Sequence, residues 1–243
     1  WLEEALLLLP DDLREKFFHN LDQWLFYVQN TIQLSQNLNE KVEVILSEAR
    51  VFNDQIQTVD DLKRLPIEQL NHFANQQISS HQLLSLFQGG IAGSGQSLLL
   101  GADIPLMLII NLRAVQLIGS CYGYDMRHPF EMMIALKVFY SATLPKRFQK
   151  TAWNQLMEEI ADSNLPFLYE GSEKIIESSW LTRPLSQLLK AWMILIFNKK
   201  KDNSPSMISM FFGAGVNYSI TKRVLSFTQH FYQLRLLEEK INT

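Results

Sequence analysis

Residues 216–240 read VNYSITKRVLSFTQHFYQLRLLEEK, and this stretch decides the fold class of the chain. Its apolar residues recur every three or four positions, which is the spacing that brings side chains onto one face of an α-helix. The recurring positions are Val216, Ile220, Val224, Phe227, Phe231 and Leu234. The stretch therefore predicts a long C-terminal amphipathic helix that ends at about Lys240.

The same helical spacing continues towards the N-terminus of the chain. Residues 13–32 carry an apolar face of this kind, and Pro66, Pro129 and Pro145 stand where new helices can begin. No window shows the sustained alternation of apolar and polar residues that is typical of a strand. The sequence therefore predicts an all-α, multi-helix protein.

We expect one helical domain over residues 1–243. The distribution of charge distinguishes an acidic N-terminal part of this domain from an apolar remainder. Residues 1–64 hold twelve acids and six bases, a local balance of −6. We therefore expect acidic N-terminal helices over residues 10–64 and an apolar core region over residues 66–240.

The centre of the chain is almost free of charge. Between residues 71 and 124 only Asp103 and Arg113 are charged, and glycines gather between Gly89 and Gly95. Gly89 and Gly90 are placed to end the helix that Pro66 opens. Small residues let helix backbones approach closely, so the pattern predicts a Gly-rich, apolar central helical hairpin. The uncharged runs 82–102 and 203–221 approach the length of a membrane span but are rich in Gly, Ser and Gln. Burial in the protein, shallow insertion into a membrane and true spanning all stay open.

The net charge and the cysteine content limit the partners and the cellular compartment that we expect for the protein. The net charge of −3 offers no global attraction to nucleic acid. A single cysteine, Cys121, excludes an intrachain disulfide framework and fits a reducing compartment such as the bacterial cytoplasm. The expected location is therefore cytoplasmic. Shallow insertion of the uncharged runs would add peripheral contact at the inner face of the cell membrane.

Motifs for chemistry are weak throughout the sequence. Residues 90–97 have the spacing of a phosphate-binding P-loop, but Gln96 stands where lysine is needed, so we expect no nucleotide. Ser94 lies between glycines, yet Ala92 and Gln96 break the nucleophile-elbow motif. The five histidines are scattered. We therefore predict no catalytic set, no metal site and no cofactor.

Asp103 and Arg113 are the more informative charges, because an isolated charge is costly to bury. Asp103 is placed to cap the start of a helix that runs past Arg113. The two lie roughly 15 Å apart along that helix, too far to pair. Arg113 is expected either to bond carbonyls or groups of the C-terminal helix, or to line a pocket for a polar ligand or partner. Its candidate neighbours are Asn111, Asn217, Tyr218 and Thr221.

Several short motifs together resemble the EcsC family, and the likeness covers most of the chain. The motifs are the Gly89–Gly95 patch, Asp103-Ile104-Pro105, Asn111-Leu112-Arg113-Ala114, Tyr122-Gly123-Tyr124-Asp125, Pro129-Phe130-Glu131, Leu144-Pro145-Lys146-Arg147, Gly213-Ala214-Gly215-Val216-Asn217-Tyr218 and Tyr232-x-x-Arg235. The gene that names the family lies beside those for the ATPase and membrane subunit of a bacterial ABC transporter. The resemblance thus implies a helical, cytoplasmic-side protein associated with that transport system, and it implies no enzyme activity. It also adds Arg235 to the candidate site residues.

These observations favour a non-catalytic accessory or regulatory protein of an ABC-type exporter, with transporter subunits or membrane lipid as partners. One alternative is a membrane-associated hydrolase that uses Asp103, Tyr122, Asp125 and Tyr218 as polar groups. Another is a carrier that holds a lipid or peptide in an internal cavity.

Basic residues offer a possible lipid contact. Lys199, Lys200 and Lys201 form a run, and Lys146, Arg147 and Lys150 form a second group. Such groups can face anionic lipid, or they can be ordinary solvated helix ends.

Overall fold

The computed structural model describes residues 2–33, 36–92, 100–161, 179–201 and 214–242. Every regular element in these ranges is a helix, so the prediction of an all-α fold is confirmed. The elements are α1 (Leu2–Leu7), α2 (Asp11–Gln33), α3 (Gln36–Arg50), the 3₁₀ helix η1 (Asp60–Arg64), α4 (Ile67–Ala92), α5 (Leu100–Cys121), α6 (Pro129–Thr143), α7 (Lys146–Ala161), α9 (Ser179–Lys201) and α10 (Ala214–Asn242).

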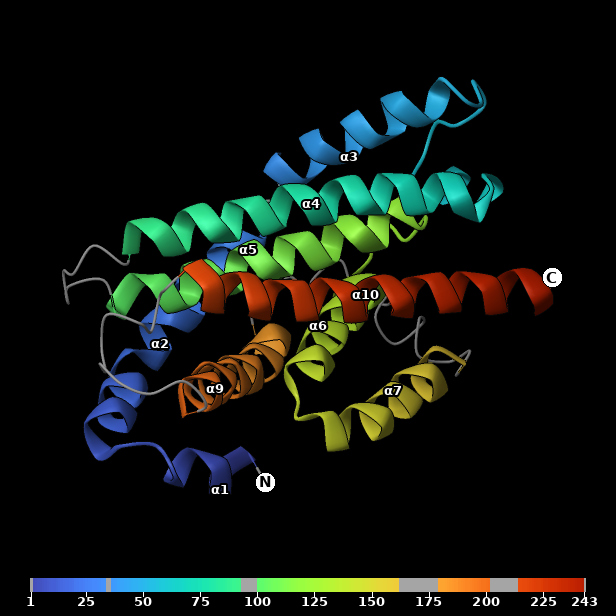
Figure 1. Cartoon of the computed structure of the whole chain (residues 1–243). Helices are drawn as coiled ribbons and strands as arrows, with labels where there is room; N and C mark the ends of the chain where they lie inside the picture. Colours follow the sequence, from blue (N-terminus) through green and yellow to red (C-terminus); the bar gives the residue numbers. More distant parts are fainter. Residues whose placement is uncertain (1, 34–35, 93–99, 162–178, 202–213, 243) are drawn as a thin grey trace.

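Helices α4, α5 and α10 form the long axis of the molecule. α4 and α5 run antiparallel as the predicted central hairpin, and α10 lies against both of them (Figure 1). The glycine-rich connection at residues 93–99 lies outside the described residues. α10 is the long C-terminal helix that the apolar spacing predicts, and it buries Ile220, Val224 and Phe231.

Two predicted helix boundaries are wrong. α4 continues through Gly89 and Gly90 to Ala92, because glycine weakens a helix without forcing it to end. α5 begins at Leu100, so Asp103 lies inside its first turn instead of capping it. Pro105 is the sixth residue of this helix, so its missing N–H removes one hydrogen bond near the start of the helix.

The uncharged centre of the sequence is the core of the fold. From Pro105 onward, α5 is buried on nearly every side, and its apolar residues belong to one cluster with those of α1, α2, α3 and the later helices. At Gly119, an added Cβ would lie 2.3 Å from Met126 Cε and 2.8 Å from Tyr232 Cζ. This close approach of α5 and α10 explains why a residue without a side chain stands there.

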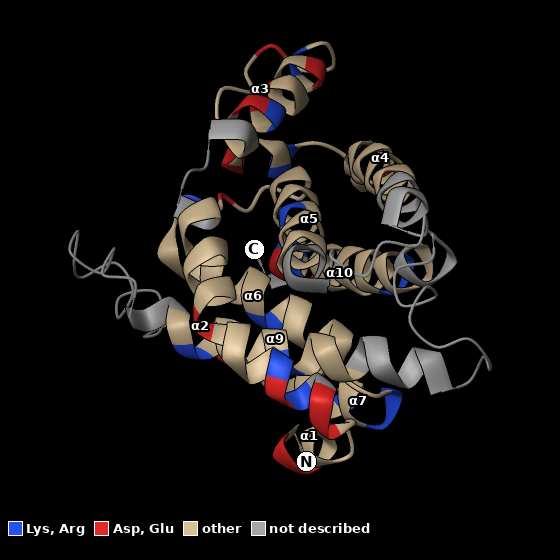
Figure 2. Ribbon diagram, turned by 90° about the vertical axis from the view of Figure 1, so that its left-hand side faces the viewer, with Lys and Arg blue, Asp and Glu red and all other residues tan. Residues whose placement is uncertain are grey.

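The remaining helices pack around this axis. α6 begins at Pro129 and α7 directly follows Pro145, as predicted, while α9 carries Pro184 within its length. α2 contacts α5 and α9, and it lies on the other side of α5 and α6 from α10 (Figures 1 and 2). Among the described residues, no helix combines the length and hydropathy that crossing a bilayer requires.

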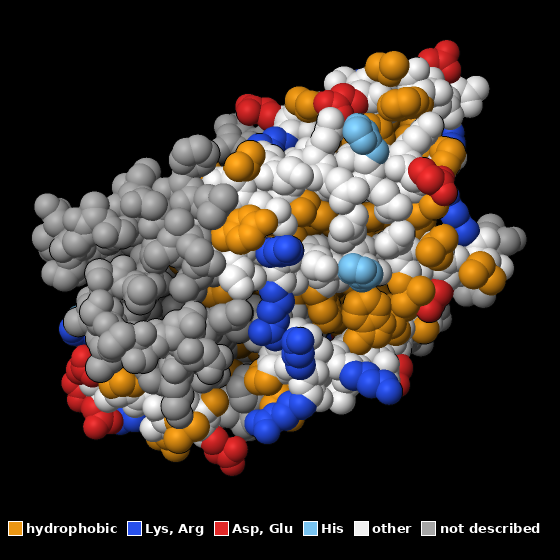
Figure 3. All heavy atoms as spheres, viewed as in Figure 1, with side chains coloured by type: hydrophobic (Ala, Val, Ile, Leu, Met, Phe, Trp, Pro, Cys, Tyr) orange, Lys and Arg blue, Asp and Glu red, His pale blue; other side chains and the backbone are white. Residues whose placement is uncertain are grey.

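The surface around α10 is electrically uneven. Lysine and arginine side chains gather below α10 in the view of Figure 3, towards the start of α7. Carboxylates lie at the opposite ends of the same helices, at Glu158 and Glu159 on α7 and at Glu238 and Glu239 on α10. α7 and α10 therefore contribute to two regions of opposite character.

Candidate functional site

Charged side chains gather around a pocket of about 660 Å³, which we name the polar pocket. It lies between η1, the α5–α6 connection, the end of α7 and the last turns of α10. Its charged and polar lining consists of Asp60, Lys63, Tyr124, Asp125, His128, Glu131, Arg235, Glu238 and Glu239. Phe130, Met157, Ile160 and Ala161 complete the wall. Two of the candidate residues from the sequence, Asp125 and Arg235, are therefore part of one site.

Arg235 is the most strongly held charge in this pocket. Its Nη1 and Nη2 donate to the two carboxylate oxygens of Glu131 at 2.7 Å each, which joins α10 to α6. The side chains are only 6% and 13% exposed. Burial alone would lower the pKa of Arg235, but its hydrogen bonds to the Glu131 carboxylate outweigh burial and raise the pKa. This bidentate, charge-assisted pair is a structural clamp.

Tyr124 lies between two cations. Lys63 Nζ lies 4.4 Å from the centre of its ring, and Arg235 Cζ lies 3.9 Å from it. Lys63 Nζ also donates to Glu239 Oε2 at 3.1 Å, which ties η1 to α10. Burial raises the pKa of Tyr124, so its phenol stays neutral. The ring therefore packs as a cation–π partner and is not activated as a base.

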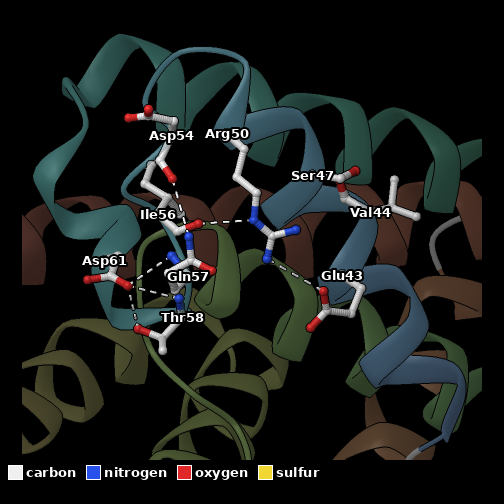
Figure 4. A network of polar contacts seen from close by, with 9 residues as sticks. All are labelled: Glu43, Val44, Ser47, Arg50, Asp54, Ile56, Gln57, Thr58 and Asp61. Carbon is white, nitrogen blue, oxygen red and sulfur yellow. Dashed lines mark hydrogen bonds and ion pairs between the residues drawn. The ribbon is translucent and has the colours of Figure 1, made fainter.

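The segment before η1 positions Lys63 through local polar contacts (Figure 4). Arg50 Nε donates to the carbonyl of Ile56 at 3.0 Å. Asp61 Oδ2 accepts bonds from the backbone N–H of Thr58 at 2.8 Å and from its hydroxyl at 2.9 Å. Hydrogen bonds from backbone N–H groups lower the pKa of Asp61, and the bond from Thr58 has the largest effect. These bonds replace the regular helix ladder and hold the connection between α3 and α4 in one conformation.

Asp125 is paired within its own loop. Arg127 Nε lies 2.8 Å from Asp125 Oδ2, and the Arg127 backbone N–H donates to Oδ1 at 2.9 Å. Burial acts to raise the pKa of Asp125, but the bonds from Arg127 prevail and lower it. Gly123, with a φ of 88°, turns the chain from α5 into this loop. Asp125 is therefore an ionised loop anchor.

Tyr122 points away from the polar pocket. Its hydroxyl donates to Asn71 Oδ1 on α4 at 2.6 Å. Burial raises its pKa to about 12. Tyr122 and Asp125, which the hydrolase alternative grouped together, thus serve different parts of the fold.

Arg113 lies in a different part of α5. Its Nη2 donates to the backbone carbonyl of Thr31 on α2, and its Nη1 lies 3.3 Å from Gln116 Oε1. These two acceptors lie on α2 and α5. The sequence alone also suggests acceptors on the C-terminal helix, α10. Burial lowers the pKa of Arg113. Asn111, one turn earlier, is buried and donates to the carbonyl of Met107 at 2.9 Å.

The other candidate residues do not complete a pocket around Arg113. Thr221 is buried on α10 and its hydroxyl has no hydrogen-bond partner among the described residues, while Tyr218 is half-buried. The side chains of Asp103 and Asn217 lie outside the described part of the structure. The candidate set is thus dispersed along the molecule, and only Asp125 and Arg235 share a site.

Sequence reasoning missed the partners of Arg235. Glu131 and Tyr124 occur in the quoted motifs, but nothing local indicates that they meet a residue more than a hundred positions later. Lys63 and Glu239 lie in charge-rich segments that look solvated. No three His, Cys, Asp or Glu side chains in the described ranges come together as a metal site.

Comparison with known proteins places the chain among a group of bacterial relatives. The model of the EcsC protein family matches residues 1–237. The chain is 25% identical over 130 residues to the uncharacterised protein YdbA of Bacillus subtilis, covering 54% of this chain and 47% of that protein. It is 27% identical over 118 residues to the protein EcsC of the same organism, covering 45% of this chain and 50% of that protein. The aligned regions thus span about half the length of these relatives. No solved structure matches the chain.

Proposed function

The chain belongs to the EcsC protein family, and on that premise we propose that it is a non-catalytic accessory protein of an ABC-type exporter at the cytoplasmic face of the membrane. In this role it binds exporter subunits and regulates or supports them, and it performs no chemistry on a substrate. The family resemblance suggests the exporter as the partner, and we propose that the surface of α2 binds it.

One face of α2 carries the proposal. Glu15, Phe18, Asp22 and Phe26 recur every three or four positions on this helix and are all exposed, and we name them the α2 stripe. Phe26 is 66% exposed, and its neighbour Tyr27 is 50% exposed. Large aromatic side chains at such exposure are characteristic of surfaces that a partner covers.

The chemistry of the α2 stripe suggests the partner. Carboxylates alternate with aromatic rings, so the complementary surface is a helix or loop that carries both basic and apolar side chains. An acidic stripe is repelled by anionic lipid, which favours a protein partner over the bilayer itself. We therefore assign the α2 stripe to an exporter subunit.

The polar pocket supports binding over catalysis. Its central cation, Arg235, is engaged by Glu131, and Asp125 is engaged by Arg127. Burial strongly raises the pKa of the one thiol, Cys121, so the thiol is not a ready nucleophile. A carrier for lipid requires an apolar cavity, whereas seven of the thirteen residues that line this pocket are charged.

The proposal is tested by co-purification from the native host. Burying a phenylalanine contributes about 1.5–3 kcal/mol, so replacing both Phe18 and Phe26 by serine should reduce recovery of the exporter ATPase and membrane subunit at least tenfold. The matched control replaces Leu83 and Leu84 on α4, which are 56% and 46% exposed, by serine. This control should recover the exporter at the wild-type level. Absence of both exporter subunits from the wild-type preparation would reject the proposed function.

A further inference from the structure

Five cations gather where α7 begins beside α10, and we name them the basic strip. They are Lys146, Arg147 and Lys150 on α7, and Lys222 and Arg223 on α10. Arg223 Nη2 donates to the carbonyl of Leu144, which directly precedes Pro145 and α7, so the two helices meet at this point. Figure 3 shows basic side chains on this face, below α10.

Within the part of the chain that the structure describes, the basic strip lacks carboxylate partners. Within the described ranges, none of its five side chains forms an ion pair with a carboxylate. The carboxylates of α7 lie at its far end, where Glu159 is bound to Lys137 at 2.5 Å. The cations therefore repel one another, and no carboxylate among the described residues is bound to them.

The position of the α7 cations within the helix adds to this imbalance. α7 has 16 residues, and Lys146 and Arg147 are its first two. The N-terminal end of a helix carries a partial positive charge, so cations there destabilise the helix and an external anion is favoured. Neither the folding of α7 nor its packing on α6 explains three cations at this end.

Aromatic side chains flank the basic strip. Trp153 is half-buried one turn beyond Lys150 and stacks edge-on against Phe227 of α10 at 5.2 Å. Arg147 Cζ lies 4.7 Å from the ring of Phe148. Trp153 and Phe227 pack against the core and fix the place where α7 meets α10. The half-buried Phe148 beside Arg147 is the kind of aromatic and cationic pair that occurs at the headgroup level of a bilayer.

We infer that the basic strip is the face with which this protein binds an anionic phospholipid bilayer, by attraction to headgroup phosphates and without deep insertion. The inference deepens the proposed function, on which it rests for the presence of the protein at a membrane. A membrane suits the strip better than nucleic acid does, because the cations are confined to one short region, whereas a nucleic-acid backbone favours a longer track of basic residues. The ring of Phe148 beside Arg147 favours the same partner.

Vesicle flotation tests the inference on the full chain. The probe is vesicles of phosphatidylcholine with about a third phosphatidylglycerol, and the variant is Lys146→Gln/Arg147→Gln/Lys150→Gln. Each cation near an anionic surface contributes about fivefold to partitioning, so the variant should bind about 100-fold more weakly than wild type. Wild-type binding should also fall at about 0.5 M salt, where charges are screened within a few ångströms.

A matched control removes the same charge elsewhere. Lys16, Lys41 and Arg183 are exposed on α2, α3 and α9, and replacing all three by glutamine should leave vesicle binding within a factor of three of wild type. Equal losses in the two triple variants, equal binding to vesicles of pure phosphatidylcholine, or tighter binding to single-stranded RNA than to the anionic vesicles would each overturn the inference. Recovery of the exporter subunits is read separately, so loss of lipid binding and loss of the proposed exporter contact are distinguished.

Discussion

The two ends of α7 and α10 present the same residue types in opposite states. At the polar pocket, Arg235 is buried between Glu131 and the ring of Tyr124, and Lys63 is bound to Glu239. At the basic strip, the cations are mostly exposed and have no carboxylate partner among the described residues. The role of a charged side chain in this protein therefore depends on its pairing and burial. A buried ion pair fixes helices relative to one another, whereas an exposed cation without a carboxylate partner is available to bind another molecule.

The largest effect of a substitution on stability is expected at Arg235. Arg235→Ala leaves the carboxylate of Glu131 buried without its partner, which should reduce the free energy of unfolding by about 3–5 kcal/mol. Urea denaturation followed by circular dichroism measures it. Replacing both residues, as Arg235→Met with Glu131→Leu, should be much less destabilising because no charge is left unpaired. A loss below about 1 kcal/mol for Arg235→Ala would show that the clamp does not hold α6 and α10 together.

A smaller effect is expected at Arg113, whose guanidinium donates to the backbone carbonyl of Thr31 and to the side-chain amide of Gln116. Arg113→Ala should reduce the free energy of unfolding by about 1.5–3 kcal/mol, the range for hydrogen bonds that involve a charged group. Arg113→Lys should recover only part of this, since lysine lacks the planar fork. If Arg113→Ala were as damaging as Arg235→Ala, the bidentate pair with Glu131 would not be what makes Arg235 the more important residue for stability.

Substitutions of Gly123 test how much the conformation of the turn before the polar pocket contributes to stability. Its φ of 88° and the 2.4 Å approach of an added Cβ to Lys63 Cγ predict that Gly123→Ala costs about 1–2 kcal/mol. Gly123→Asn should be milder, because asparagine tolerates a positive φ better than alanine does. Thermal melts of both variants check this. Equal costs would indicate that crowding against Lys63, and not backbone strain, is responsible.

The smallest effect on stability is expected at the basic strip. The variant Lys146→Gln/Arg147→Gln/Lys150→Gln removes mutual repulsion and an unfavourable helix-end charge, so its free energy of unfolding should stay within about 0.5 kcal/mol of wild type or rise slightly. Chemical denaturation measures it. A clear loss of stability would assign these cations to the fold and remove the contrast with Arg235.

Periodic sequence patterns were sufficient for most of the fold. The apolar spacing of residues 216–240 and the prolines at 129 and 145 predict α10, α6 and α7, because these signals act within a turn or two of the chain. The ends of the central hairpin were harder to predict. Gly89 and Gly90 are compatible with a helix as well as with its end, and local sequence does not show which packing contacts extend α4 to Ala92.

The candidate site was less predictable for a physical reason. Arg113 is conspicuous because its neighbours in sequence are uncharged, yet its partners are a carbonyl of α2 and a nearby amide. Arg235 is less conspicuous in a charged segment, yet it forms the buried clamp with Glu131. Sequence composition measures how isolated a charge is along the chain, whereas burial and pairing depend on contacts between distant residues. The family motifs included Arg235 where composition alone passed over it.

The most direct test of the membrane-facing side is hydrogen exchange with and without anionic vesicles, followed by mass spectrometry of peptides. The first backbone N–H groups of α7 have no acceptor within the helix, so a bound bilayer should slow their exchange. We predict slower exchange in peptides that contain Lys146–Lys150, with no change in peptides that contain Arg235–Glu239. Slower exchange confined to the polar pocket or to α2 would contradict the account, because the paired end of the molecule, or its acidic face, would then be the one that meets the membrane.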